Sequence, residues 1–451
     1  MTRFKQISMI CFVATAMYLW SCEDNKSDNF GKIPFDPSKP VRIDSFEPDS
    51  GGLATKVFIT GSNFGTDLSK IKVYYTAKAS DESTVTMRAP VVGSDGEHLY
   101  VITPKMSNLR GCTISVVVNK DSTSTELINK KFMYRTMYVI RTIAGRKGTT
   151  EFKPGTLATA EFQYPSTITM DTEGNLFVSH WRVPYSFLRI NEEENIVEAL
   201  EIGSTTNTMY AFGAPTCDSK GVVSAISDNA RTFFTFDPME AWSPRQRAIL
   251  SAGPGGTPFE FSTAHSLAAH PITGDLYTRM FSNGHLVKVD PVTREGTKVS
   301  DTTPSSDSYL VFDPVNPNIL YIAYHHLHCI GKFDLATKEH TIFAGRSGSS
   351  GWQDGPIGDA RFNTPNQLIV APNGNLYVAD RGNHCIRMIT LDGQGGGIVS
   401  TIIGKGGVAG YQDGNPDDAL FNNPRGVAVA PNGDIYITDY ENNVVRKLTI
   451  E

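Results

Sequence analysis

Residues 362–387 read FNTPNQLIVAPNGNLYVADRGNHCIR, and residues 421–446 read FNNPRGVAVAPNGDIYITDYENNVVR. The two segments share Phe, Asn and Pro near their starts, a Pro-Asn-Gly turn in the middle and a final Arg. In each, the turn is followed by a short run of aliphatic and aromatic residues, which is typical of a β-strand. The repetition indicates a fold built from copies of one small β unit.

A third copy aligns with these two without a gap when the chain is set on Gly145, Gly345 and Gly404. The positions shared by all three copies are Phe152, Trp352 and Tyr411; Gly155, Gly355 and Gly414; Phe162, Phe362 and Phe421; and Pro165, Pro365 and Pro424. The turn-then-strand unit recurs more loosely elsewhere, so that six units start at residues 174, 221, 274, 318, 374 and 433. A period of about 50 residues with several short strands per unit predicts a β-propeller, here with six blades.

The ends of the repeat predict how the propeller closes. The last unit is too short to hold its outermost strand, whereas residues 138–145 match the outer strands expected at 340–345 and 397–404. We therefore expect the N-terminal strand of residues 136–451 to complete the sixth blade, which leaves no open sheet edge.

The repeat resembles the NHL family of propellers. The residues that carry the resemblance are Phe362–Pro365, Pro372–Asp380 and Asn383–Arg387, with their counterparts between Phe421 and Arg446. Two copies match well and one fairly, whereas the copies between about residues 210 and 343 have diverged. The resemblance implies an NHL-type propeller fold.

Residues 40–135 are predicted to form a separate β module. Short alternating strands are punctuated there by Gly, Pro and Asn, which is typical of a β-sandwich. Pro48, Gly51-Gly52, the string Ile59–Gly65, Pro104 and the closing Phe132–Tyr134 resemble the TIG/IPT family of immunoglobulin-like domains. In that string, Gly61 and Gly65 are expected to permit tight turns and Phe64 to close the end of the sandwich.

The N-terminal sequence predicts where in the cell the protein is located. Arg3 and Lys5 precede an apolar run that is too short to span a bilayer, as in a secretory signal covering residues 1–21. The ending Leu19-Trp20-Ser21-Cys22 resembles a bacterial lipobox, which implies lipidation of Cys22. Residues 22–39 then form an acidic, polar tether, which resembles the export signal of outer-membrane lipoproteins that face the cell exterior. The alternative is an ordinary cleaved signal that leaves no anchor.

Composition excludes some classes of function. Of 451 residues, 40% are hydrophobic and 20% are charged, and the net charge of −6 argues against a nucleic-acid partner. Beyond Cys22, Cys112, Cys217, Cys329 and Cys385 show no metal-binding spacing and are expected to be buried thiols.

Variation among the six copies points to a binding face, because a residue type repeated at the same position in several blades is expected to serve packing. Trp352 is therefore expected to plug a loop, and Asp380 and Asp439 to form turns and cap nearby backbone groups. The two positions after the second strand of each unit vary, and they bring aromatic and planar polar groups to one rim. The predicted ligand-binding residues are Trp181, Arg182, Phe281, Tyr324, His325, Arg381, Arg425 and Tyr440. Such groups stack on sugars and hold hydroxyls, although aromatic rims also serve packing between blades.

No sequence motif indicates catalysis. There is no HExxH, phosphate-binding loop or serine elbow, so we expect no catalytic residue, no metal ligand and no cofactor. Convergence of His180, His265 and His325 on the channel, or a calcium ion held there, stays open as an alternative.

The leading hypothesis is an all-β, non-enzymatic lipoprotein of the outer membrane. It would be anchored through Cys22 and would bind a glycan or another surface ligand on the channel face of the propeller. The arrangement resembles accessory lipoproteins of outer-membrane polysaccharide uptake systems, which implies uptake proteins as partners. The alternatives are a propeller lyase or lactone hydrolase with a channel cation, and a scaffold that binds only proteins.

Overall fold

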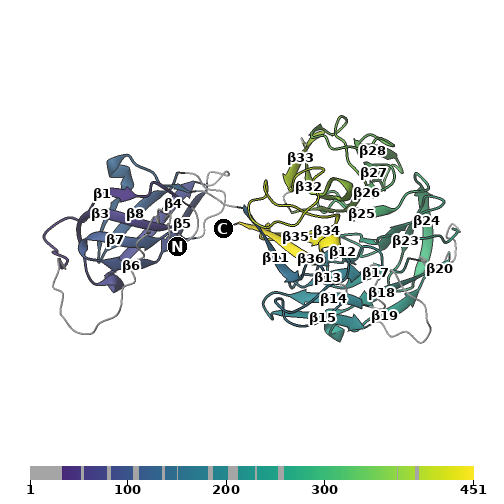
Figure 1. Ribbon diagram of the computed structural model, residues 1–451, viewed down its shortest axis with the longest axis horizontal. Helices are drawn as coiled ribbons and strands as arrows, with labels where there is room; N and C mark the ends of the chain where they lie inside the picture. Colours follow the sequence, from purple (N-terminus) through teal and green to yellow (C-terminus); the bar gives the residue numbers. More distant parts are fainter. Residues whose placement is uncertain are drawn as a thin grey trace, which may run out of the picture. The chain divides into compact units, whose positions relative to one another are not determined.

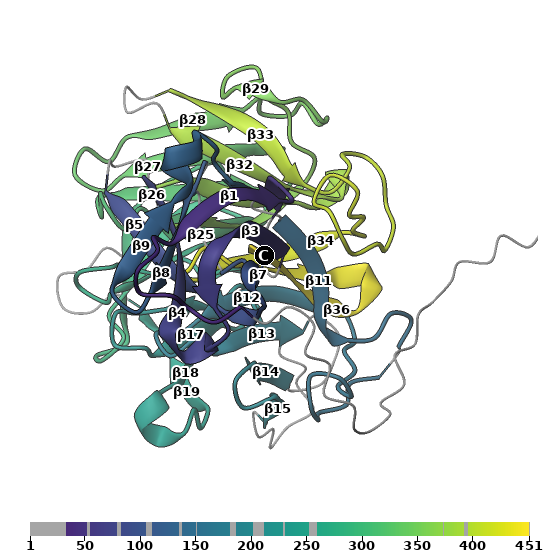
Figure 2. The ribbon, with the colours of Figure 1, turned by 90° about the vertical axis from the view of Figure 1, so that its left-hand side faces the viewer.

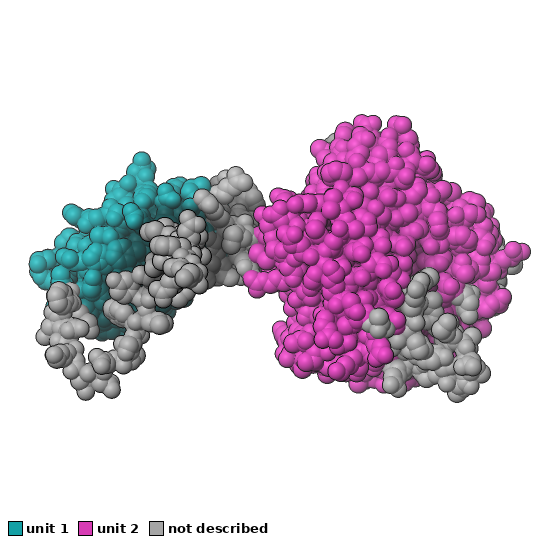
Figure 3. All heavy atoms as spheres, viewed as in Figure 1, with its two compact units in different colours: residues 1–135 teal, residues 136–451 magenta. Residues whose placement is uncertain are grey.

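The computed structural model describes residues 33–51, 55–78, 83–104, 111–134, 138–149, 151–180, 186–201, 212–228, 231–251, 259–372, 374–391 and 396–450. The chain forms two compact units, residues 1–135 and 136–451, which we call the N-terminal and C-terminal units (Figure 3). Both are built from strands, and the helical segments in the described ranges are short 3-10 turns. None of these helices has the length and apolar character needed to cross a bilayer. Cys22, Trp181 and Arg182 lie outside the described residues.

The N-terminal unit contains two four-stranded antiparallel sheets. In order across each sheet, the strands are β1 (Arg42–Glu47), β3 (Lys56–Gly65), β7 (Gly96–Ile102) and β6 (Val91–Ser94), and then β5 (Thr84–Ala89), β4 (Ile71–Lys78), β8 (Thr113–Val118) and β9 (Asp121–Ser124). A short pair, β2 (Ser50–Gly51) and β10 (Met133–Tyr134), adds a parallel contact. Alternate side chains of β3, β4 and β8 are buried in one hydrophobic cluster, as expected for two sheets packed face to face.

The expectation that Gly61 forms a turn is wrong. Gly61 lies inside β3, which continues to Gly65 across an irregular stretch of its pairing with β7. A Cβ on Gly61 would lie 1.9 Å from the carbonyl oxygen of Arg42, so glycine is needed there for close approach of two strands. Phe64 is fully buried.

The described strands of the C-terminal unit form six sheets, each ordered as an antiparallel meander (Figure 1). From the first strand to the outermost, the first sheet contains β12 (Pro165–Met170), β13 (Leu176–His180), β14 (Ser186–Asn191) and β15 (Ile196–Glu201), and the second contains β16 (Thr216–Cys217), β17 (Val223–Ile226), β18 (Thr232–Phe236) and β19 (Arg245–Ala248). The third sheet contains β21 (Ala268–Ala269), β22 (Leu276–Arg279), β23 (His285–Val289) and β24 (Glu295–Asp301), and the fourth contains β25 (Ser308–Phe312), β26 (Ile319–Tyr324), β27 (Cys329–Asp334) and β28 (His340–Gly345). The fifth sheet contains β30 (Pro365–Val370), β31 (Leu376–Asp380), β32 (Cys385–Leu391) and β33 (Gly397–Ile403), and the last contains β34 (Pro424–Val429), β35 (Ile435–Asp439), β36 (Val444–Ile450) and β11 (Tyr138–Gly145). Two further short strands, β20 (Leu250–Ser251) and β29 (Gly355–Pro356), pair with β24 and β33.

The first strands of the six sheets face one another. Each contacts the first strand of the next sheet, from β12 through β16, β21, β25 and β30 to β34, and β34 contacts β12. Together they line a cavity of about 340 Å³. Gln367 of β30 lines this cavity. Its side-chain carbonyl accepts a hydrogen bond from the backbone N–H of Ile168 in β12 at 2.9 Å, and its amide nitrogen donates one to the carbonyl of Ile168 at 2.6 Å.

The predicted pairing of the first and last strands of the repeat is present. β11 lies antiparallel to β36 in the same sheet as β34 and β35, and Figures 1 and 2 both show the two strands side by side. The carboxylate of Asp413 accepts a hydrogen bond from the backbone N–H of Thr142 at 2.9 Å, and it also contacts Arg446 of β36. This link ties β11 to the loop that precedes the last sheet.

The repeated Asp residues cap backbone groups, as the sequence predicted: the carboxylates of Asp380 and Asp439 accept hydrogen bonds from the backbone N–H groups of Asn363 and Asn422, at 2.8 and 2.7 Å. They also bind buried arginines, which the sequence did not predict. Asp380 and Asp439 are fully buried, and each accepts a hydrogen bond from the buried arginine seven residues later in the chain. Trp352 is 53% exposed and lies against Gly406, while its indole N–H donates to Thr401 at 2.9 Å. This placement agrees with the expected role of Trp352 as a loop plug.

The described cysteines take no part in a disulfide. Cys112, Cys329 and Cys385 are buried and Cys217 is half-buried. Burial raises the pKa of the thiols of Cys112 and Cys329 to about 11, so both stay protonated at neutral pH.

Candidate functional site

The candidate site lies where the first strands begin and the second strands end. These two points are adjacent in every sheet because the first two strands are antiparallel. Polar and aromatic residues from five sheets gather there, and we call them the mouth cluster: Asp228, His265, Phe281, Asp307, His325, His326, Arg381, Arg425 and Tyr440.

One half of the mouth cluster pairs histidines with carboxylates. His265, just before β21, lies 3.4 Å from the carboxylate of Asp228 through Nε2 and 3.5 Å from that of Asp307 through Nδ1. The Nδ1 atom of His326 accepts a hydrogen bond from the backbone N–H of Asp307 at 3.2 Å. Burial raises the pKa of Asp228, His265 lowers it, and Asp307 raises it. The ring of Phe281 lies 6.1 Å from both imidazoles and forms the apolar wall of this half.

The other half contains two arginines around a neutral histidine. The Nη1 atom of Arg381 lies 3.4 Å from Nε2 of His325. The guanidinium of Arg425 stacks 3.5 Å above the ring of Tyr440, whose ring in turn lies 5.0 Å from that of Tyr164. Burial lowers the pKa of His325 to about 3, and Arg381 adds to this effect. The imidazole is therefore neutral at physiological pH.

Charged groups of both halves act on the phenol of Tyr309 in β25. Burial raises the pKa of its phenol to about 12, Arg425 lowers it and Asp307 raises it. The site thus has an acidic side and a basic side with aromatic rings beside both, which suits a polar ligand with an apolar face.

Three residues of the mouth cluster have metal-ligand chemistry. Asp307, His325 and His326 each offer one ligand atom, and these atoms lie within 4.8 Å of one another. A carboxylate and two imidazoles are ligands that zinc and related divalent ions accept.

The structure brings five of the eight predicted ligand-binding residues into the mouth cluster: Phe281, His325, Arg381, Arg425 and Tyr440. Tyr324 is not among them, because it is fully buried and its hydroxyl hydrogen-bonds His340 on the outermost strand at 2.8 Å. Trp181 and Arg182 lie outside the described residues.

Tyr324 points into the sheet while His325 points toward the mouth cluster, because the side chains of neighbouring residues at a strand end point in opposite directions. The residue that ends or directly follows each second strand is buried in all six sheets: His180, Ser227, Met280, Tyr324, Asp380 and Asp439. The next residue joins the mouth cluster in every sheet where it is described. The prediction merged these two positions, although only the second one faces the site.

Sequence reasoning did not select Asp228, Asp307 or Tyr164. Asp228 occupies the variable position that supplies Phe281 and His325, so the same count along the repeat would have found it. Asp307 and Tyr164 precede first strands, where their repeat has no fixed residue type. For Asp307 the sequence carries no signal.

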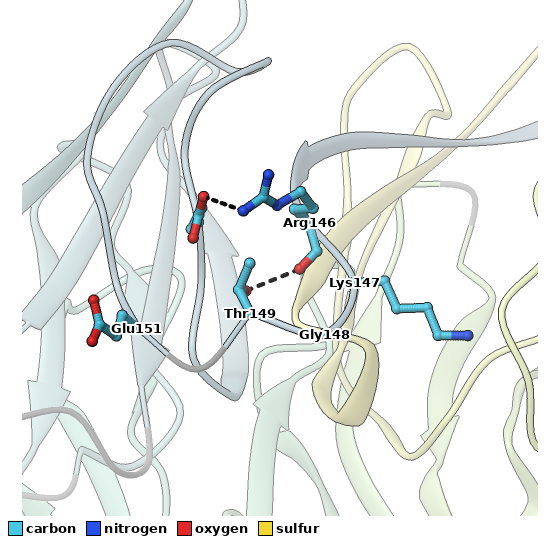
Figure 4. Close-up of a pocket in the computed structure, with 6 residues that line it drawn as sticks. Arg146, Lys147, Gly148, Thr149 and Glu151 are labelled. Atoms are coloured by element: carbon cyan, nitrogen blue, oxygen red, sulfur yellow. Dashed lines mark hydrogen bonds and ion pairs between the residues drawn. The ribbon is translucent and has the colours of Figure 1, made fainter.

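A second, shallower pocket lies on the loop after β11. It has a volume of about 420 Å³ and is lined by Arg146–Thr149, Glu151 and Glu161. Figure 4 shows Arg146 directed at the Glu161 carboxylate, at 2.8 Å, and Lys147 pointing away. Its polar side chains are those of an exposed ion pair, so we place the candidate site at the mouth cluster.

Comparison with known proteins identifies the repeat. Residues 362–387 and 421–448 match the NHL repeat model. The chain contains NHL repeats. NHL repeat-containing protein 2 of Gallus gallus is 40% identical over 88 residues, which are 19% of this chain and 11% of that protein. Protein SUPPRESSOR OF QUENCHING 1, chloroplastic, of Arabidopsis thaliana is 36% identical over 77 residues, 17% of this chain and 7% of that protein. The aligned segments therefore span only a small part of these relatives.

Solved structures from Bacteroides are similar along most of the NHL-containing chain. An auxiliary nutrient binding protein from Bacteroides ovatus has a TM-score of 0.69 and 25% identity, over 93% of this chain and 100% of that one. Another from Bacteroides thetaiotaomicron has a TM-score of 0.61 and 25% identity, over 93% and 99%. A protein of unknown function from the same species has a TM-score of 0.64 and 26% identity, over 93% and 100%. This all-β chain is thus similar to NHL-type propeller proteins of Bacteroides.

Proposed function

We propose that this chain is a non-enzymatic binding protein of the bacterial cell surface, with its ligand site at the mouth cluster. The observation that carries the proposal is the convergence of polar and aromatic side chains from five sheets, some buried and some partly exposed, in one connected cluster. Packing within a sheet does not require such convergence, and a ligand with several polar groups does. The similarity to proteins named auxiliary nutrient binding proteins supports a binding role.

The proposed ligand is a glycan. Phe281 and Tyr440 offer aromatic faces for sugar C–H surfaces, while the aspartates, histidines and arginines offer planar partners for hydroxyls. In this proposal the C-terminal unit is a six-bladed propeller, and the N-terminal unit is a TIG/IPT spacer. Cys22 carries the lipid, and the protein faces the cell exterior beside outer-membrane uptake proteins. Many anchored copies on one polymer would turn modest affinity into firm retention.

Phe281→Ala tests the site. We expect it to weaken glycan binding about 10-fold, or about 1.4 kcal/mol, because the change removes the apolar wall between His265 and His326. The measurement is a glycan array followed by titration of the best ligand. Trp352→Ala is the matched control, since it removes an exposed aromatic ring outside the mouth cluster. Equal affinity of the Phe281 variant and the wild type, or no glycan bound at all, would contradict the proposal.

A metal-dependent enzyme is the second candidate, and the group of Asp307, His325 and His326 favours it. The binding proposal predicts well under one equivalent of zinc, calcium or manganese in protein purified without chelators or an affinity tag. Elemental analysis measures this directly, and the variant His326→Gln provides the baseline. One equivalent of metal in the wild type that disappears in His326→Gln would favour the enzyme.

A further inference from the structure

Three buried arginines in the C-terminal unit are each neutralised by two carboxylates, whereas the fully buried Arg279 is held by Thr302, Ser308 and the carbonyl of Ser306, with no ion pair among the described residues. The three examples, all with N···O distances of 3.2 Å or less, are Arg387 with Asp354 and Asp380, Arg446 with Asp413 and Asp439, and Arg189 with Glu194 and Glu198. Such pairing is expected, because a buried charge without a partner is costly.

Arg381 is half-buried and also lacks a carboxylate partner. It forms no ion pair with any residue that the structure describes, and the one hydrogen-bond contact of its side chain there is with His325. Burial lowers the pKa of the neighbouring Arg425, and repulsion from Arg381 lowers it further, whereas Glu441 contributes a smaller attraction. Two positive groups therefore lie close together beside a neutral imidazole.

His325 holds Arg381 in place in the mouth cluster. Its Nε2 atom lies 3.4 Å from Nη1 of Arg381, and its buried ring also interacts with the backbone of Pro365.

We propose that the basic half of the mouth cluster binds an anionic group of the ligand, a carboxylate or a sulfate. Arg381 and Arg425 hold its oxygens. Guanidinium groups match these anions in shape and bind them through paired N–H donors. Asp228 and Asp307 on the opposite half repel the anion, so the charge distribution also orients the ligand. Resting on the proposed glycan-binding function, this inference makes the substrate class acidic saccharides.

The test compares two probes of equal length. Isothermal titration of the full chain uses a galacturonic acid hexasaccharide and its fully methyl-esterified form, which lacks the charges. We expect the acid to bind at least about 10-fold more tightly, and Arg381→Gln to lose about 10- to 100-fold for the acid alone. Arg346→Gln is the control, because it removes an exposed arginine from another loop.

A separate arm uses inorganic sulfate as the probe. Sodium sulfate should raise the Tm of the wild type more than that of Arg381→Gln at equal ionic strength. If sulfate raises the Tm in this way but the hexasaccharide does not bind, sulfate is the preferred anionic group. Arg381→Gln should fold, since it removes a like charge beside Arg425, and its Tm in chloride verifies this.

The outcomes separate the two proposals. If the acid and the ester bind alike and Arg381→Gln changes neither, the anion inference is wrong while glycan binding stands. If neither saccharide binds and the glycan array also shows no ligand, the proposed glycan function fails, and sulfate decides the anion site. An equal sulfate response in the wild type and Arg381→Gln would then overturn the inference.

Discussion

Arg387→Leu is expected to lower the free energy of unfolding of the C-terminal unit by about 3–5 kcal/mol. The guanidinium of Arg387 is fully buried, and it donates to Asp380 at 2.8 Å and to Asp354 at 2.6 Å. It also caps the backbone carbonyls of Gln353 and Arg361. Without the arginine, the fully buried Asp380 loses the positive charge that balances it, and the carbonyls of Gln353 and Arg361 each lose one of their hydrogen-bond donors.

The other sheets indicate how this loss can be reduced. Strand pairing places Arg387 opposite Val378, and the residues at the equivalent point of the other sheets are Leu188, Phe234, Val287, Gly331 and Arg446. Four of the six sheets therefore do without the ion pair. We expect the double variant Asp380→Asn/Arg387→Leu to be more stable than Arg387→Leu by about 1–3 kcal/mol, because no uncompensated charge remains.

Tryptophan fluorescence during urea unfolding measures both effects. Trp181, Trp242 and Trp352 belong to the C-terminal unit, and protein expressed from residue 22 onward lacks the fourth tryptophan, Trp20, so the signal follows this unit. Arg146→Leu is the control: Arg146 is 72% exposed and its ion pair with Glu161 is expected to contribute under about 1 kcal/mol. If the single and double variants lose the same stability, Asp380 and Arg387 are not coupled and the explanation fails.

The repeat predicted the fold best where packing repeats. Phe162, Phe362 and Phe421 are fully buried, and the pairing of residues 138–145 with the last strand followed from matching outer strands. Positions that depend on contacts between distant segments were predicted poorly. Gly61 is required by the carbonyl of Arg42, a neighbour across the sheet that no local pattern in the sequence reveals.

The candidate site was predicted in part for a similar reason. Variation between copies pointed to the end of the strands where the mouth cluster lies, but it does not say which of two adjacent residues faces outward. Tyr324 and His325 both vary, and only the structure shows that Gly331 leaves room for the Tyr324 ring inside the sheet, where a Cβ would lie 2.6 Å from it. Ion pairs such as Asp307 with His265 join different sheets and leave no periodic trace.

His180→Met is expected to protect the protein against acid. His180 is 2% exposed, lies 5.4 Å from the ring of Phe152, and has no hydrogen-bond partner for either ring nitrogen among the described residues. Burial lowers the pKa of His180 to about 3. Met280 fills the equivalent buried position of another sheet, so methionine suits the site.

The direction in which stability changes with pH follows from proton uptake by the unfolded chain. Below pH 6.5 the unfolded histidine binds a proton, whereas the folded one stays neutral until about pH 3. Stability is therefore lost as pH falls through this window, by about 2.7 kcal/mol at pH 4.5 for this one group. Urea unfolding at pH 7.5 and 4.5 should show that His180→Met loses less stability than the wild type by about that amount. Met280→Leu, which alters the equivalent buried position of another sheet without removing a titratable group, is the control and should keep the wild-type pH dependence. Parallel losses in the wild type and His180→Met would mean that His180 is protonated in the fold, which would require a partner for its buried ring.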